Sequence, residues 1–207
     1  MWLQILVCVL AGYLLGNLNG SVCISALMHD DVRSHGSGNA GLTNFIRNYG
    51  AGRALLVILI DAGKAVVACL VGGMILGSHG YWLEGLTLGG LAVMLGHDFP
   101  ALLGFRGGKG ILSGLFVAVS VDWRIALIIL AVFALAYLTT NYVSLGSVLA
   151  AVAFGIGFLI LHKDAPLVMW GGVIMSALTV FMHRSNIVRL LKGEERKTDL
   201  FKKGTAQ

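Results

Sequence analysis

The chain has little charge and almost no proline. Charged residues make up 12% of its 207 positions, whereas a soluble domain carries roughly 25%. So little charge excludes disorder, a nucleic-acid-binding domain with a charged surface, and almost any soluble enzyme. Two prolines and no collagen repeat exclude the fibrous classes. With 57% hydrophobic residues and a mean hydropathy of +0.85, the composition predicts a polytopic membrane protein.

Cysteine is also scarce. Cys8, Cys23 and Cys69 all lie in apolar stretches, and an odd number without paired spacing predicts neither a disulfide framework nor a zinc site. We expect them to be small buried hydrophobic residues. No Lys or Arg precedes Arg33, so the basic region of a signal peptide is missing. The first apolar segment is therefore expected to be a retained transmembrane helix.

Long apolar segments are abundant. A spanning helix needs about 20 mostly apolar residues, and no segment shows the alternation of a barrel strand. The fourth candidate has 12 residues, so it is short for a span and could instead form a re-entrant loop. The predicted spans are residues 2–27, 53–77, 81–99, 110–121, 123–139, 145–161 and 166–182.

The placement of basic residues decides between six and seven spans. Seven spans with the N-terminus outside put twelve of the 15 Lys and Arg residues on one side of the membrane. Six spans would put the seven basic residues of the tail outside, against the positive-inside rule. We therefore predict an all-α integral membrane protein with seven transmembrane helices, the N-terminus outside and the C-terminus in the cytoplasm.

Uncommon polar residues gather in four clusters, residues 34–47, 96–110, 141–147 and 183–197, all on the predicted cytoplasmic side. In the first, glycines let the backbone approach a ligand, and successive N–H groups can bind an anion. Arg47 could hold a phosphate through two N–H donors. The alternative is an ordinary polar loop between helices. Agreement between topology and polar clustering favours a single site.

Two nucleotide-binding motifs are only partly matched. Glycines 36, 38 and 41 fit G-x-G-x-x-G, with Asp61 twenty residues further on. No strand precedes them and Asp61 lies in an apolar helix, so we reject a dinucleotide fold. Two glycines before Lys109 at a predicted helix start favour anion binding. They do not form a Walker A loop, because Leu103 and Gly110 occupy required positions.

Other polar residues have both a structural and a functional interpretation. Asp61 and Lys64 are spaced i, i+3 in a predicted span, where charges are costly and are either paired or functional. His97 is more often a hydrogen-bonded structural histidine than a base. His183 and Asn186 share a helical face directly after the last span, whereas the basic residues of the tail are expected to attract anionic lipid.

Together these clusters resemble the bacterial acylphosphate-dependent glycerol-3-phosphate acyltransferases, the PlsY family. Three patterns differ slightly from those of the family, at Ala40, Leu42, Ala65 and Asn141, and the early G-S-I-P-S segment reads G-N-L-N-G at 16–20. The matched patterns are S-G-N-P-G-A-T-N-x-x-R at 37–47, D-x-x-K-G at 61–65, G-H-x-F-P at 96–100, F-x-G-G-K-G at 105–110, Y-V-S-L-G-S at 142–147 and H-R-x-N-I-x-R-L-x-x-G-x-E at 183–195.

The resemblance implies acyl transfer from an acyl phosphate to glycerol 3-phosphate, giving lysophosphatidic acid and phosphate, the first step of phospholipid synthesis. It implies the bacterial cell membrane, with the active site facing the cytoplasm. Residues 1–182 would form the transmembrane acyltransferase domain, and 183–207 a basic tail that contributes to the site. We expect both substrates and membrane lipid as partners, with no nucleic acid, cofactor or metal. Because the donor is a reactive mixed anhydride, orientation and electrostatics should carry catalysis.

The resemblance and the chemistry of the side chains suggest three groups of site residues. The general base stays open between His97, His183 and a substrate phosphate oxygen. The expected catalytic residues are His183, Asn186 and Lys109; the phosphate-binding residues are Ser37, Asn39, Thr43, Asn44, Arg47, Gly107, Gly108 and Ser144; and the supporting residues are His97, Lys64, Asp61 and Arg189.

Other classes explain fewer of these features. The His-x4-Asp pattern of thioester-dependent glycerolipid acyltransferases is absent, which favours the acyl phosphate donor. A transporter with Asp61 and Lys64 as a relay would need polar residues on both faces, but the predicted outer loops are nearly bare. A lipid-binding subunit accounts for the basic tail and not for the glycine-rich loops. A lipid phosphatase or phosphotransferase is less consistent with scattered acids and no metal cluster.

Overall fold

The structure is a computed structural model that describes residues 1–198, and every regular element in that range is helical. The predicted all-α class is thus confirmed for the described residues. The part of the predicted tail beyond residue 198, with Lys202 and Lys203, lies outside them. The elements are α1 (Trp2–Gly16), α2 (Gly20–Ala26), η1 (Val32–Ser34), α3 (Leu42–Tyr49), α4 (Ala54–Gly77), α5 (Trp82–Asp98), η2 (Ala101–Leu103), α6 (Ile111–Val121), α7 (Trp123–Thr140), α8 (Val143–Leu161), α9 (Pro166–Met182) and α10 (Arg184–Leu191).

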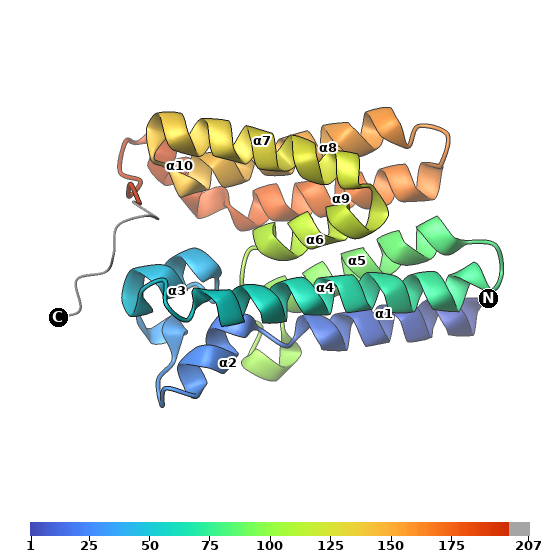
Figure 1. Cartoon of the computed structure of the whole chain (residues 1–207), viewed down its shortest axis with the longest axis horizontal. Helices are drawn as coiled ribbons and strands as arrows, with labels where there is room; N and C mark the ends of the chain where they lie inside the picture. The colour runs from blue at the N-terminus through green and yellow to red at the C-terminus, as the bar shows by residue number, and fades with distance from the viewer. Residues whose placement is uncertain (199–207) are drawn as a thin grey trace.

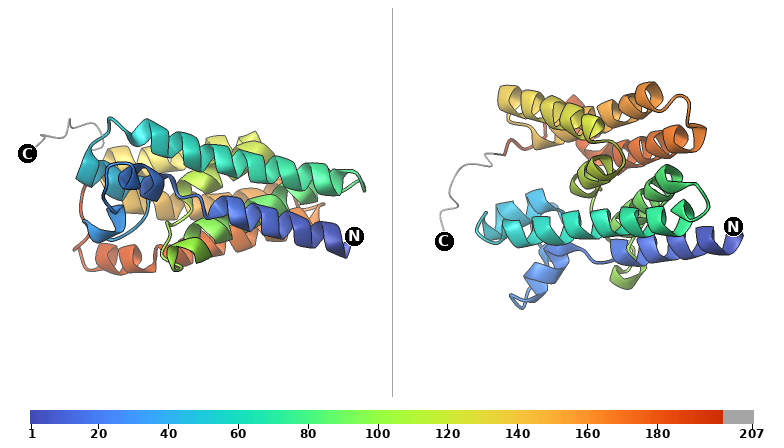
Figure 2. Two further views of the ribbon diagram at one scale, coloured as in Figure 1. Left: turned by 90° about the horizontal axis from the view of Figure 1, so that it is seen from below. Right: turned by 45° about the vertical axis from the view of Figure 1, so that its right-hand side comes forward.

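The long helices lie side by side in two groups (Figures 1 and 2). Helix α4 packs against α1 and α5, and α8 packs against α7 and α9. The short helix α6 contacts both groups, and α5 also contacts α9. Helices α3 and α10 lie at the end of the bundle opposite the N-terminus (Figure 1). This end, called the α3 end below, brings the first and last polar clusters of the sequence close together.

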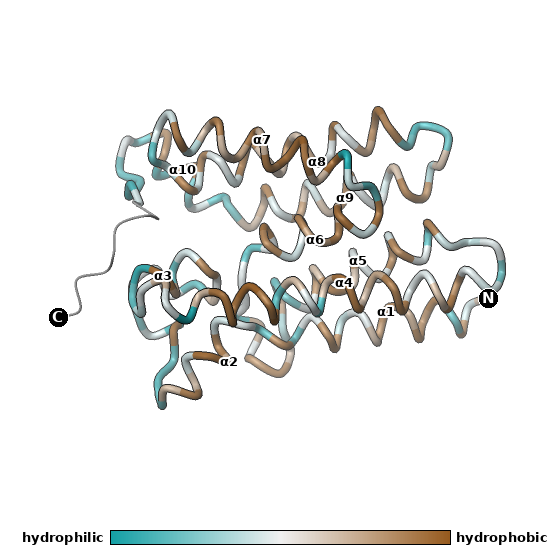
Figure 3. The backbone as a smooth tube through the Cα atoms, in the orientation of Figure 1, coloured by the Kyte–Doolittle hydropathy of each residue, from teal (hydrophilic) through white to brown (hydrophobic). Residues whose placement is uncertain are grey.

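Four helical segments are long and apolar enough to cross a membrane alone: α4, α7, α8 and the run Trp82–Leu103. The pairs α1 with α2 and α9 with α10 are bent by 43° and 56°, and each could count as one further span, which gives up to six. Helix α6 is apolar but has only 11 residues. Figure 3 shows hydrophobic residues along the long helices, with hydrophilic residues mainly at their ends.

The single helix predicted over residues 2–27 is wrong, because the chain breaks between Gly16 and Gly20. Asn19 Oδ1 accepts the Val22 N–H at 3.1 Å and so caps α2. Its Nδ2 donates to the Ala40 carbonyl at 2.9 Å. Asparagine favours such caps because its side chain replaces backbone partners at a helix end. The break therefore ties α2 to the first glycine-rich loop.

Small residues allow α4 and α5 to approach closely. A Cβ added to Gly72 would lie 2.1 Å from the Gly85 carbonyl oxygen, closer than any van der Waals contact. Membrane helices associate through such close packing, because lipid supplies no hydrophobic driving force between them. Cys8 and Cys69 are buried, as predicted, whereas Cys23 is half-buried.

Replacing Gly72 by Ala should therefore destabilise the fold. We expect the free energy of unfolding to fall by about 2 kcal/mol or more, because a backbone carbonyl must move to admit the methyl group. Denaturation in detergent micelles measures the change. Gly63→Ala on the same helix is the matched control, since its Cβ would meet nothing within 4 Å. Equal stability of the Gly72 and Gly63 variants would contradict this packing.

Candidate active site

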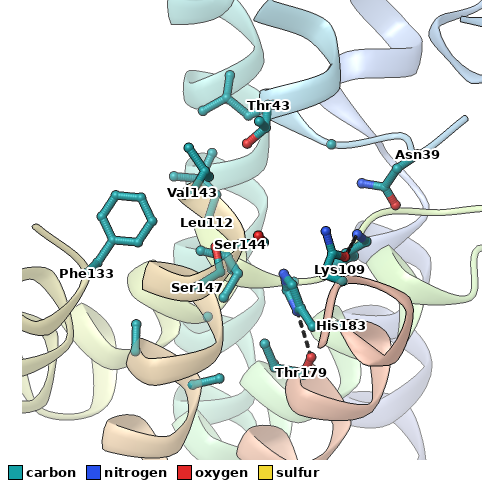
Figure 4. Close-up of a pocket in the computed structure, with 18 of the residues that line it drawn as sticks. Asn39, Thr43, Lys109, Leu112, Phe133, Val143, Ser144, Ser147, Thr179 and His183 are labelled. Atoms are coloured by element: carbon teal, nitrogen blue, oxygen red, sulfur yellow. Dashed lines mark hydrogen bonds between the residues drawn. The ribbon is translucent and has the colours of Figure 1, made fainter. Parts of the chain in front are cut away.

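A cavity of about 350 Å³ opens at the α3 end of the bundle (Figure 4). It draws residues from all four polar clusters of the sequence. A second cavity of about 340 Å³ adjoins it and shares part of its lining. The residues common to both are Ser37, Asn39, Arg47, Lys109, Arg189 and Glu195.

The shared lining favours anions. Arg47, Lys109 and Arg189 are cations, and Glu195 is the one acid among these common residues. The excess positive charge, with serine and asparagine beside it, suits a phosphate group. The expected catalytic residues His183 and Asn186, and the expected phosphate ligands Thr43 and Ser144, line the larger cavity.

The first glycine-rich loop is shaped by Asn44. Its Nδ2 donates to the carbonyls of Val32, His35 and Asn39 at 3.0–3.1 Å. Its Oδ1 accepts the Ser37 backbone N–H at 3.0 Å. A side-chain amide has two N–H donors and one oxygen, so these bonds use its capacity. Asn44 lines the larger cavity, and these contacts hold the loop that carries Ser37; its phosphate-binding role stays a prediction.

The second glycine-rich loop packs against the end of α5. A Cβ on Gly107 or Gly108 would lie 2.0 Å from the carbonyl oxygen or the Nε2 of His97, respectively. The Gly108 N–H donates to the His97 carbonyl at 3.0 Å, and the Gly107 carbonyl accepts from Ala40 N–H at 3.3 Å. Neither glycine is among the residues that line the two cavities. These contacts give both glycines a packing role that brings Lys109 to the site, and their phosphate contact stays a prediction.

Lys109 and His183 lie beside each other in the cavity (Figure 4). Lys109 Nζ donates to Asn186 Oδ1. His183 Nδ1 lies 2.9 Å from the Thr179 carbonyl, and because a carbonyl only accepts, Nδ1 carries the proton. In the neutral ring, Nε2 is then a proton acceptor. The site thus combines a cation, an amide and a base.

Glu195 accepts hydrogen bonds from two residues that line the cavity, Asn186 and Arg189. Its Oε1 accepts from Asn186 Nδ2 at 3.1 Å, and its Oε2 accepts from Arg189 Nε at 2.8 Å. In the sequence this glutamate stands within the family pattern at 183–195, and it was not among the predicted site residues. Glu195 directly follows another acid, Glu194, and no spacing distinguishes the two, so the burial and partners of Glu195 are apparent only in the structure.

Asp61, Lys64 and His97 form a buried network, and Asp61 and His97 also line the larger cavity. Lys64 Nζ lies 2.8 Å from Asp61 Oδ1 and 2.7 Å from His97 Nδ1. The Gly20 N–H donates to Asp61 Oδ1 at 3.1 Å. All three side chains are nearly inaccessible to solvent. This arrangement supports the paired interpretation of Asp61 and Lys64, and a hydrogen-bonded structural role for His97, which is held against Gly108.

Ser144 offers a free hydroxyl. It lines the larger cavity, and its buried Oγ has no hydrogen-bond partner among residues 1–198. A buried hydroxyl without a partner is costly, so a ligand that hydrogen-bonds to it would be stabilised. Ser144 therefore fits the ligand-binding role predicted from the sequence.

The deeper part of the larger cavity is apolar. It is lined by Leu112 and Leu115 of α6, Ile129 and Phe133 of α7, and Phe154 of α8. Figure 4 shows Phe133 and Leu112 on the side away from Lys109. None of these residues was predicted to lie in the site, because an apolar side chain in a membrane helix has the same pattern whether it faces lipid or a cavity.

Fold and site together define an all-helical membrane protein with a cavity that is lined partly by cations and partly by apolar side chains. The family model described as "Glycerol-3-phosphate acyltransferase" matches residues 6–193. The chain belongs to this family, which confirms the resemblance seen in its motifs.

Relatives and solved structures match nearly the whole chain. The glycerol-3-phosphate acyltransferase of Thermoanaerobacter pseudethanolicus is 38% identical over 89% of this chain and 91% of its own. That of Finegoldia magna is 36% identical over 95% and 97%. Crystal structures of the integral membrane enzyme PlsY in its glycerol 3-phosphate and lysophosphatidic acid forms have TM-scores of 0.83 and 0.80. Their identities are 33% and 32%, and they cover 96% and 95% of this chain and 99% and 96% of their own.

Anion binding at Lys109 should weaken at alkaline pH. Burial, with a further contribution from the nearby Arg189, lowers the pKa of Lys109 to about 8. The ammonium form is therefore present below this pH and is lost as the pH rises through it. We expect the dissociation constant of sulfate, whose charge is constant between about pH 6 and 10, to rise above pH 8. Thermal-shift titrations of the purified protein measure it.

Lys109→Arg is the matched control for this pH dependence. Arginine keeps its charge over the whole range, so its pH profile should be flat. A flat profile in the unsubstituted protein would contradict the role of Lys109 as the titrating cation.

Proposed function

We propose that this protein transfers a fatty acyl group from an acyl phosphate to glycerol 3-phosphate, giving lysophosphatidic acid and phosphate. The observation that carries the proposal is the cavity itself. Its polar mouth holds three cations, Arg47, Lys109 and Arg189, and its deeper part is apolar. Such a cavity fits a molecule with a phosphate at one end and an acyl chain at the other. Membership of the glycerol-3-phosphate acyltransferase family supports the acceptor.

The acyl phosphate donor is supported by the number of anions that the site can hold. Donor and acceptor each bring a phosphate group, and two such groups repel each other unless cations lie between them. The two adjoining cavities share Arg47, Lys109 and Arg189, so one set of cations can serve both phosphates. Ser37, Asn39, Thr43 and Ser144 would supply further hydrogen bonds.

The reaction needs orientation and one proton acceptor. The primary hydroxyl oxygen of glycerol 3-phosphate attacks the acyl carbonyl carbon and forms the ester bond. The bond from that carbon to the phosphate oxygen breaks, and phosphate leaves with the electron pair. His183 Nε2 or a substrate phosphate oxygen accepts the hydroxyl proton. His97 suits this role less well, because its Nδ1 accepts from Lys64 and its ring packs under Gly108.

The two polar side chains beside His183 would stabilise the reacting groups. Lys109 can neutralise charge that develops on the carbonyl oxygen or on the leaving phosphate. Asn186 is held by Glu195 and can orient the acceptor together with Lys109. Because these groups are already fixed by their neighbours, little reorganisation is needed during the reaction.

The proposal includes the topology of a bacterial cell-membrane protein with seven spans, the N-terminus outside and the site facing the cytoplasm. Four long segments, two bent pairs and the short helix α6 would make up the seven. The N-terminus and α10 lie at opposite ends of the bundle, as an odd number of crossings requires (Figure 1). The α3 end carries most of the basic residues, in keeping with the positive-inside rule.

The donor can be tested directly. Purified protein mixed with palmitoyl phosphate and labelled glycerol 3-phosphate should form labelled lysophosphatidic acid, whereas palmitoyl coenzyme A should give none. Thin-layer chromatography of the lipid extract measures the product. Product formation from the thioester alone would contradict the acyl phosphate donor while leaving the acceptor in place.

Arg47→Ala should lower kcat/KM at least about 100-fold, because a charge-assisted bidentate contact to phosphate is lost. The same assay measures this, with the thermal unfolding midpoint as a check on folding. Arg53→Ala is the control, since Arg53 lines neither cavity. Near-normal activity of the Arg47 variant would remove this residue from the site.

A further inference from the structure

The segment after α10 crosses the mouth of the site. Residues 193–198, called the strap here, begin at Gly193, whose φ of +71° ends the helix. At its far end, the Thr198 N–H donates to the Asn141 carbonyl at 3.0 Å, and Tyr137 Oη donates to the Thr198 carbonyl at 3.1 Å. Thr198 is 6% exposed. The backbone of Thr198 is therefore fixed at the corner between α7 and α8.

The side chain of Thr198 meets Arg47 of α3. Both Nε and Nη2 of Arg47 donate to the Thr198 hydroxyl oxygen, although the two residues are 151 positions apart. Nη2 also lies 3.5 Å from the Arg196 carbonyl. Within residues 1–198 the guanidinium makes no other hydrogen bond. The strap thus holds the arginine that we assign to a substrate phosphate.

The geometry of these bonds leaves one edge of the guanidinium for a ligand. An arginine can bind phosphate bidentately through its Nε–Nη2 edge or its Nη1–Nη2 edge. Thr198 occupies the first edge, whereas Nη1 has no partner among the described residues. Arg47 lines both cavities, so its remaining edge is available to a phosphate in either.

We propose that Thr198 is a positioning residue, whose hydroxyl orients Arg47 so that the Nη1–Nη2 edge binds the phosphate of a substrate. This inference rests on the proposed function, which assigns Arg47 to that phosphate. A freely rotating arginine side chain loses conformational entropy when it binds a ligand. An arginine whose rotamer is already restricted by Thr198 loses less conformational entropy. The family match ends at residue 193, so Thr198 lies outside the segment that defines the family.

Two substitutions distinguish the effect of the Thr198 hydroxyl from the effect of the backbone contacts of the strap. Thr198→Val keeps the shape and both backbone hydrogen bonds but removes the acceptor, and Thr198→Ser keeps the acceptor. In the Val variant we expect a roughly tenfold rise in KM for the substrate whose phosphate Arg47 holds, with kcat within about twofold, because a hydrogen bond to a charged group is lost. The Ser variant should resemble the unsubstituted protein. Varying each substrate against a saturating amount of the other identifies which phosphate is held.

Two controls test the route through Arg47. Thr139→Val removes another threonine hydroxyl near the same corner, one that donates to Leu135, and should change neither KM. In an Arg47→Ala background, Thr198→Val should have no further effect. The dissociation constant of sulfate, a stand-in for the phosphate group, gives the same comparison without turnover. It should rise about tenfold in Thr198→Val and stay unchanged in Thr198→Ser and Thr139→Val.

The outcomes are distinct. Unchanged KM and sulfate affinity in Thr198→Val would overturn the proposal, as would equal effects of Val and Ser, or an undiminished effect in the Arg47→Ala background. If Thr198→Val fails to fold, Thr198→Ala replaces it in every comparison. If the unsubstituted protein transfers no acyl group from any donor, the proposed function fails, while the sulfate measurements still decide whether Thr198 positions Arg47 for an anion.

Discussion

The site depends on placing three cations around one small space. Arg47, Lys109 and Arg189 repel one another, and an empty cavity lined by them would be unstable without compensating contacts. Each is held by a different acceptor: a threonine hydroxyl, an asparagine oxygen and a glutamate. Bound phosphate would neutralise the charges that remain. The three cations give the cavity a positive electrostatic potential that favours anions. Their hydrogen bonds limit how far each side chain can move.

A buried network supports the loop that carries one of these cations, Lys109. A chain of contacts runs from the Gly20 N–H through Asp61 and Lys64 to His97, and from the His97 carbonyl to Gly108. It links the break in the first span to the loop that carries Lys109. Charges buried in a membrane protein are tolerated when they pair in this way. The network therefore connects the packed helices α4 and α5 to the loop that carries Lys109.

Several residues have structural contacts that the sequence did not predict, because sequence patterns do not distinguish a residue that binds a ligand from one that supports the site. Glycine-rich loops suggested phosphate contacts for Gly107 and Gly108, but steric contact with His97 accounts for these two glycines. Asn44 is a polar residue in the right loop, yet its amide is used by the backbone around it. Glu195 accepts hydrogen bonds from Asn186 and Arg189, but the sequence motif that contains it did not predict this role. In each case the deciding fact is a specific contact made by the folded chain, between residues that a turn or helix end brings together.

The helical membrane class, the gathering of polar residues into four clusters and the family could all be predicted from the sequence. These features follow from hydropathy and local composition, which act along the chain and need no partner. The contacts of the folded chain were needed to establish where the first helix breaks, which apolar residues line the cavity, and which polar groups are free to bind a ligand. Those properties depend on hydrogen-bond partners and close packing between segments up to 151 positions apart, which no local pattern encodes.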